Sequence, residues 1–112
     1  MATLLYNNTF SNVGIIPVNI VTVNAANIVT VLGLNICNKY DIPVSVDGYI
    51  TKSGNNFYVF KNLNIDSTTT VVAIGDNQRL NIGPSQTLCI QASANNFIDV
   101  IVSYAETEVV LP

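Results

Sequence analysis

A run of strict alternation at residues 27–38, NIVTVLGLNICN, limits what this chain can fold into more than any other stretch. Its even positions carry mostly large apolar side chains, and its odd positions pass from valine to small or polar residues. A β-strand with one buried face requires a period of two, because successive side chains point to opposite faces of the sheet. We therefore interpret residues 27–38 as a central strand whose even face, from Ile28 to Ile36, lies in the core.

Shorter segments of the same kind follow along the chain, separated by residues typical of turns. The expected strands are residues 15–23, 44–51, 57–61, 68–74, 79–82, 87–92 and 97–106. Pro17 cannot donate to a sheet ladder, so the first of them should lie at an edge or begin after the proline. Gly48 predicts either a bulge in its strand or a close approach to its backbone. About eight strands at this spacing, with no helical period, predict an all-β fold, an antiparallel, jelly-roll-like β-sandwich.

The composition supports this fold class and limits the partners. Val, Ile and Thr supply 38 of the 112 residues, which favours sheet over helix. Charged residues make up 10%, and the net charge is -3. Direct binding to nucleic acid or to a membrane surface needs clustered Lys and Arg, and the 4 basic residues here are scattered. We therefore expect neither nucleic acid nor a membrane as a partner.

Targeting and spanning segments are not expected either. No basic residue precedes Lys39, so a secretion signal with a basic start is not predicted. The apolar run at residues 13–23 contains Pro17 and Asn19 and has about half the length that spans a bilayer.

The residues that usually carry catalysis are scarce. The chain has no histidine, which removes the commonest general base and most transition-metal sites. Most acidic residues fall in turns, where aspartate is favoured for backbone reasons. Asp76 and Asn77 resemble a fragment of a calcium loop but lack the repeat of oxygen ligands. We expect no enzyme, no catalytic residues, no cofactor and no metal.

Two residue pairs each leave two interpretations open. Cys37 and Cys89 both fall on the polar phase of their strands, and they are either free thiols or one disulfide bridge. Tyr49 and Tyr58 face each other across the hairpin predicted at residues 52–56 as an exposed aromatic pair. They form either a platform for a glycan or a cross-strand pair that stabilises the sheet.

The domain organisation predicted is an N-terminal arm at residues 1–12, a sandwich domain at residues 13–107 and a C-terminal tail at residues 108–112. The arm is either loosely ordered or packs on a neighbouring subunit. Four large apolar side chains would be costly to leave in water, and they are the candidate interface residues Leu4, Leu5, Tyr6 and Phe10.

The order of short motifs along the chain resembles a family, the small all-β virion structural proteins of tailed bacteriophages. The matching stretches are LGLNICN at 32–38, VSVDGYI at 44–50, YVFKN at 58–62, VVAIGDNQ at 71–78 and DVIVSY at 99–104. The family shares a hydrophobic ANxx strand, a VxVxxYI strand, a YxVKN strand, a VxxGGxQK hairpin and a closing DVIVSxLE strand. The chain departs from the pattern at residues 75–79, where GDNQR replaces a double glycine.

The resemblance implies a structural component of a tailed-phage virion, and we interpret the chain as a capsid decoration or cement protein that bridges neighbouring subunits. The alternatives are a neck, tail or fibre-attachment protein and, in another class, the glycan-binding module of a receptor-binding device. The implied location is the virion, with synthesis in the host cytoplasm. The implied partners are other virion proteins, such as major capsid or neck and tail proteins, and further copies of the same chain in a homo-oligomer.

Overall fold

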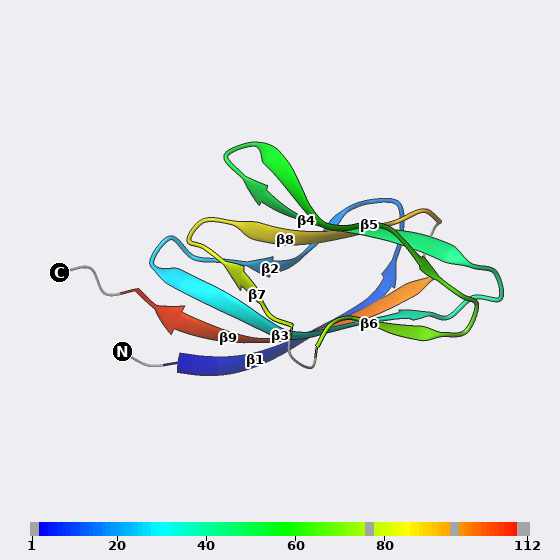
Figure 1. Cartoon of the computed structure of the whole chain (residues 1–112), viewed down its shortest axis with the longest axis horizontal. Coiled ribbons are helices and arrows are strands. Elements are labelled where there is room, and N and C mark those ends of the chain that lie inside the picture. Colours follow the sequence, from blue (N-terminus) through cyan, green and yellow to red (C-terminus); the bar gives the residue numbers. More distant parts are fainter. Residues whose placement is uncertain (1–2, 76–77, 95–96, 110–112) are drawn as a thin grey trace.

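Two antiparallel sheets pack face to face in the computed structural model, which describes residues 3–75, 78–94 and 97–109 (Figure 1). The strands are β1 (Thr3–Val13), β2 (Val18–Thr22), β3 (Asn27–Asn38), β4 (Val44–Lys52), β5 (Asn55–Ile65), β6 (Thr70–Ile74), β7 (Leu80–Ile82), β8 (Thr87–Ala92) and β9 (Ile98–Glu108). Across the described residues no helix has the length and apolarity needed to cross a membrane.

The first sheet has five strands in the order β1-β9-β3-β6, with β7 also paired to β3, and the second has four in the order β2-β8-β4-β5. The predicted all-β antiparallel sandwich is therefore confirmed. Aliphatic side chains from the facing sides of both sheets form one core, which includes Leu34, Ile36, Val46, Leu88, Ile90, Val100 and Val102. β2 begins directly after Pro17 and forms a sheet edge, as the missing proline donor requires.

The central strand β3 changes its buried phase halfway along. Val29 and Val31 face the core in its first half, and Leu34 and Ile36 in its second. The register with β9 shifts between Val31 and Gly33, and such a bulge adds one residue and inverts the phase that follows it. The expectation of a buried even face is therefore right only after Gly33, and Ile28 is 43% exposed.

The first strand, β1, was not expected. Residues 3–12 of the predicted arm do not lie apart from the sandwich but pair antiparallel with β9 from Thr3 to Phe10 without interruption. Backbone pairing with β9 orders this segment although its side chains show no clean alternation of polarity. The predicted tail is also partly ordered, because Glu108 belongs to β9 and the Val109 N–H donates to the Ala26 carbonyl at 2.7 Å; residues 110–112 lie outside the described part of the chain.

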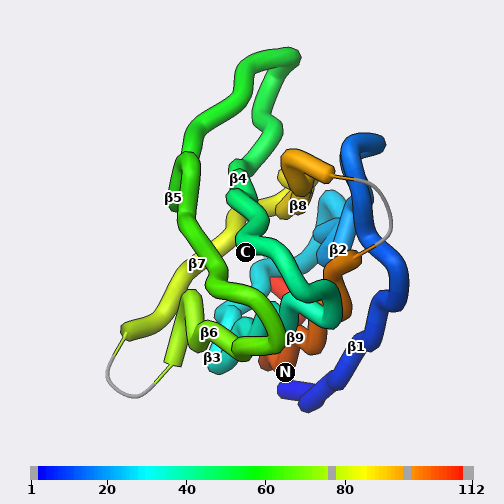
Figure 2. The backbone as a smooth tube through the Cα atoms, turned by 90° about the vertical axis from the view of Figure 1, so that its right-hand side faces the viewer, coloured from blue at the N-terminus to red at the C-terminus, as the bar shows by residue number. Residues whose placement is uncertain are grey.

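The hairpin of β4 and β5 projects beyond the rest of the sandwich (Figures 1 and 2). Its turn has positive φ at Ser53 (52°) and Gly54 (81°), which suits a tight two-residue hairpin turn. The close approach is the correct interpretation of Gly48, because a Cβ atom there would clash with the ring of Phe60. The register with β5 shifts on both sides of Gly48, but the extra residues lie in β5, and the pairing of β4 with β8 is continuous through this glycine.

Candidate functional site

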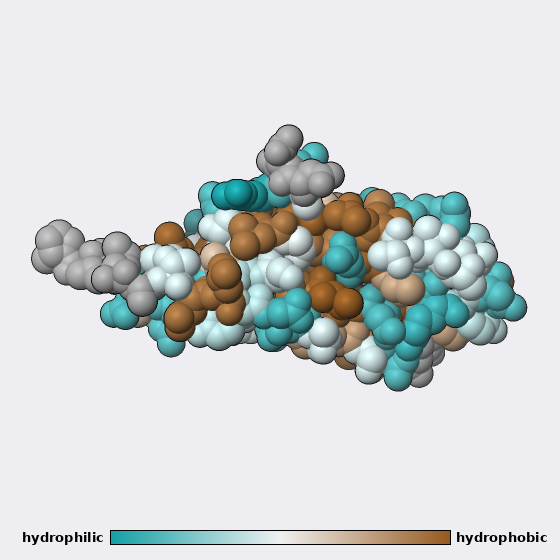
Figure 3. Space-filling model, turned by 90° about the horizontal axis from the view of Figure 1, so that it is seen from below, coloured by the Kyte–Doolittle hydropathy of each residue, from teal (hydrophilic) through white to brown (hydrophobic). Residues whose placement is uncertain are grey.

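Five exposed aliphatic side chains share the outer face of the five-stranded sheet, and we call this surface the aliphatic face. Its members are Leu5, Ile28, Leu32, Val72 and Ile101, which are 36–75% exposed. Cross-strand pairs such as Thr9–Ile101, Ile101–Asn35 and Asn35–Val72 place residues from four strands side by side. Figure 3 looks onto this side of the molecule and shows apolar side chains spread among polar ones across its middle.

The aliphatic face carries almost no charge. Its polar positions hold Thr, Ser and Asn, and the charged residue at the outward positions of these described strands is Asp99, near one end. The Asp99 carboxylate lies 3.0 Å from the Lys39 ammonium, and it also accepts a hydrogen bond from the Asn12 N–H at 3.2 Å. A face of this kind can be buried against another protein with few charges to desolvate.

The four apolar residues predicted as an interface do not form a single surface. Leu5 belongs to the aliphatic face, whereas Leu4, Tyr6 and Phe10 point to the opposite, inner side of the sheet. Phe10 packs on the core, and the Tyr6 ring stacks on Tyr104 with centroids 5.4 Å apart. Leu4 and Tyr6 are still 55% and 41% exposed, because β1 is an edge strand.

The other members of the aliphatic face were missed by the sequence reasoning. Ile28 and Leu32 had been assigned to the core phase of β3, and the bulge at Leu32 and Gly33 moves them outward. Ile101 alternates with Asp99 and Ser103 along its strand, and this apolar residue on a polar phase was the one signal in the sequence for this surface.

On the outer face of the other sheet, a row of four residues crosses all four strands. Asn19 pairs with Cys89, Cys89 with Tyr49, and Tyr49 with Tyr58. The two tyrosine rings are 5.3 Å apart, but only Tyr58 is exposed, at 48%, whereas Tyr49 is 7% exposed. The prediction of an exposed pair is therefore wrong for Tyr49, because its neighbours on both flanking strands cover it.

The ring of Tyr58 also has a charged neighbour. The Lys61 ammonium lies 4.4 Å from the centroid of the ring, a cation–π contact, and 3.8 Å from the Asp47 carboxylate. Asp47 in turn accepts a hydrogen bond from the Asn62 N–H at 2.8 Å. Lys61 thus lies against the ring of Tyr58, the exposed ring of this row.

The covered residues of this row predict a pH effect on stability. Burial raises the pKa of the Tyr49 hydroxyl above its usual 10.0, and the neighbouring Cys89, Tyr58 and Asp47 raise it further. Burial also raises the pKa of the Cys89 thiol. Both groups hold their proton more tightly in the folded state, so their contribution is complete below the pKa values of the unfolded chain and is lost as the pH rises through the folded values.

We therefore expect the free energy of unfolding to fall above about pH 8.5, where cysteine and then tyrosine begin to ionise in the unfolded chain. Tyr49→Phe should reduce this fall, because phenylalanine cannot ionise. Urea unfolding of both proteins at intervals from neutral to strongly alkaline pH measures the effect, with neutral pH as the internal reference. An equally steep alkaline fall in Tyr49→Phe would contradict the assignment.

The two cysteines lie in different sheets and are free thiols. Cys37 is half-buried on β3, and Cys89 is buried on β8, where its thiol lies 3.0 Å from the side-chain oxygen of Asn19. The disulfide interpretation therefore does not hold. Cys89 lies on the polar, outward phase of its strand as predicted, but the flanking Asn19 and Tyr49 cover it.

Metal ligands do not cluster within the described residues: no group of three or more Cys, Asp or Glu side chains is placed to hold an ion. Asp76 and Asn77, the fragment that resembles a calcium loop, lie outside the described residues.

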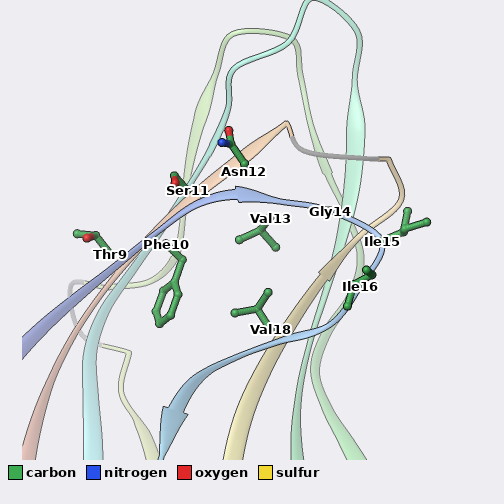
Figure 4. Close-up of a pocket in the computed structure, with 9 residues that line it drawn as sticks. All are labelled: Thr9, Phe10, Ser11, Asn12, Val13, Gly14, Ile15, Ile16 and Val18. Atoms are coloured by element: carbon green, nitrogen blue, oxygen red, sulfur yellow. The ribbon is translucent and has the colours of Figure 1, made fainter.

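The turn from β1 to β2 encloses a surface hollow of about 410 Å³. Phe10, Val13 and Val18 point into its inner side, and Ile15 and Ile16 form its rim at the bend (Figure 4). Ile16 is 76% exposed there. The hollow is apolar on its inner wall and adjoins the inner face of β1.

No protein-family model and no curated protein sequence matches the chain. Among solved structures it is similar to a chain of Bacillus endospore appendages, described as a novel family of disulfide-linked pili, with a TM-score of 0.59 and 10% identity over 96% of this chain and 89% of that one. It is also similar to a chain of the T13 IBDV viral particle, with a TM-score of 0.54 and 13% identity. This second likeness covers 96% of the present chain but only 31% of the viral one. At such identities the likeness concerns the fold.

Proposed function

We propose that this protein is a structural subunit of an assembled particle. The premise is its fold likeness to a pilus chain and to a viral-particle chain. Its role is to make contacts and not to catalyse a reaction. It acts through repeated copies, and many weak contacts then add up to a stable assembly.

The observation that carries the proposal is the aliphatic face. Five exposed aliphatic side chains on one sheet face are costly in water. A fully exposed side chain of this kind gains about 1.5–3 kcal/mol on burial, and these five, which are 36–75% exposed, would gain a corresponding part of it. The surrounding Thr, Ser and Asn side chains can hydrogen-bond without a large desolvation cost. Such a face fits permanent contact with another protein better than exposure to solvent.

The specific assembly that we propose is the virion of a tailed phage, with the chain as a capsid decoration or cement protein on the shell. Support comes from the motif order at residues 32–104, which resembles small virion proteins of such phages. In this role the aliphatic face lies against the major capsid protein and bridges neighbouring subunits.

Two alternatives predict a different location or ligand. A neck, tail or fibre-attachment protein would use the same aliphatic face at another place on the particle. A glycan-binding module would use Tyr58, the exposed ring with Lys61 beside it. Glycan-array binding that Tyr58→Ala abolishes would favour the glycan-binding module over the structural role.

The location can be tested with a short peptide tag inserted in the exposed hairpin turn at Ser53 and Gly54. Loop tips of this kind tolerate insertions best. Electron microscopy of purified particles should show the tag repeated over the shell faces. Density only at the neck or tail would favour the first alternative, and particles without the tag would contradict a virion role.

The aliphatic face can be tested in the same particles with Ile101→Lys. A lysine at the centre of an apolar contact loses the burial of isoleucine and adds a charge to desolvate, so we expect at least about a tenfold loss of occupancy. Thr22→Lys, exposed on the opposite sheet, is the matched control and should be incorporated like the wild type. Quantitative electrophoresis of particles measures both, and equal occupancy of the two variants would contradict this contact face.

A further inference from the structure

The edges of the two sheets differ in how they are protected against pairing with another strand. Natural edges carry charges, prolines, bulges or short strands, because an exposed row of N–H and C=O groups otherwise accepts a further strand. β2, β6 and β7 have only 5, 5 and 3 residues. β5 is long but carries Lys61 and irregular pairing on either side of Gly48.

β1 has none of these protections over residues 3–10. This stretch, TLLYNNTF, contains no charged residue and no proline, and its pairing with β9 first becomes irregular after Phe10. Leu5 is 75% exposed, and β1 runs along the margin of the molecule (Figure 2). Beyond Phe10 the strand turns away at Asn12, whose positive φ of 58° is held by contacts with Lys39 and Asp99.

We propose that β1 pairs antiparallel with β1 of a second copy of this chain, which joins the two five-stranded sheets into one across a two-fold axis. The inference rests on the proposed assembly role and names the partner. Among the described edges only β1 offers a long, uncharged strand with regular pairing over residues 3–10, so another β1 is its best complement. Because the paired segment is uncharged, two chains of net charge -3 meet there without opposing like charges.

The alternation of side chains restricts the register of this pairing. Residues opposite each other in one sheet must point to the same face, so the two-fold axis passes through a residue and not between two. Most of residues 3–10 stay paired only if the axis passes through Tyr6 or through Asn7. Centring on Asn7 places Leu4 opposite Phe10 of the partner copy, next to the apolar hollow that Phe10, Val13 and Val18 line (Figure 4). We assign the Asn7 register because it buries Leu4 there.

The dimer is tested on the purified protein by sedimentation velocity at micromolar concentrations. The wild type should sediment as a dimer, and Leu5→Lys/Asn7→Lys should dimerise at least tenfold more weakly, because lysines then face lysines in either register. Ile101→Lys, on the same face but one strand further in, is the control that stays dimeric. Circular dichroism confirms that each protein is folded. A monomeric wild type, a dimeric double-lysine variant or a monomeric Ile101→Lys would each overturn the proposal.

Cross-linking tests the register. In a Cys37→Ser background, Asn7→Cys should oxidise to a covalent dimer, because the two introduced thiols face each other across the axis, and Tyr6→Cys should not. A covalent dimer of Tyr6→Cys alone overturns the register, and failure of both variants to cross-link overturns the pairing.

The dimer and the proposed function can fail separately. A dimer that never enters particles would refute only the proposed function, and a monomer that occupies particles would refute only the dimer.

Discussion

Replacing Asn38 by alanine is expected to destabilise the protein by about 3 kcal/mol or more, because several buried polar groups lose their partners at once. Asn38 is 0% exposed. Its side-chain nitrogen donates to the carbonyls of Ile42 (2.8 Å), Ile65 (3.2 Å) and Asp66 (3.3 Å), and its oxygen accepts from the Tyr40 N–H (3.0 Å). One side chain thus joins the end of β3, the turn that follows it and the end of β5.

Urea unfolding at neutral pH measures this prediction. Asn35→Ala is the matched control, since Asn35 is an exposed asparagine on the same strand, and it should change stability by no more than about 0.5 kcal/mol. Equal losses in the two variants would show that the hydrogen bonds of Asn38 contribute no more than an exposed amide does.

Gly48→Ala is the second large effect, with an expected loss of about 1–3 kcal/mol from overpacking. A Cβ atom at this position would lie 2.6 Å from Cε1 of Phe60, closer than carbon atoms approach. The ring of Phe60 occupies the place that a side chain at position 48 of β4 would take, so the glycine is required by this close approach.

A double-mutant cycle separates the clash from any loss of backbone flexibility. In a Phe60→Leu background the ring is gone, and Gly48→Ala should then cost at least about 1 kcal/mol less than in the wild type. Thermal or urea unfolding of the four proteins provides the coupling energy. Strictly additive effects of the two substitutions would assign the cost to the backbone instead.

Much of the fold was predictable because most strands alternate and the turns between them carry typical residues. The bounds of β3 and β8 agree with the predicted segments 27–38 and 87–92. β1 was not recognised as a strand, since Asn8 and the half-exposed Tyr6 share its inner face with Leu4 and Phe10. Only an edge strand tolerates such a mixture, and the sequence does not reveal which strand pairs β1.

The candidate site was less predictable than the fold. Both phases of β3 are apolar around Leu32, so alternation alone did not reveal the bulge that turns Ile28 and Leu32 outward. The burial of Tyr49 depends on β8 and β5 lying on either side of β4, and this strand order is not encoded in local periodicity. Positions decided by neighbours distant in sequence are those where the predictions were wrong.

The pairing of β1 with β9 has a consequence for biosynthesis. These are the first and the final described strands, so the five-stranded sheet cannot close until almost the whole described chain has been synthesised. Contacts of such long sequence separation make folding slow, because a large loop must close before they form. During translation the uncharged β1 segment stays unpaired until β9 has been synthesised. Two nascent chains on one messenger RNA would then each carry an unpaired β1 close to the other. Chaperone binding to this segment, or pairing between neighbouring nascent chains, would therefore act before the sandwich exists.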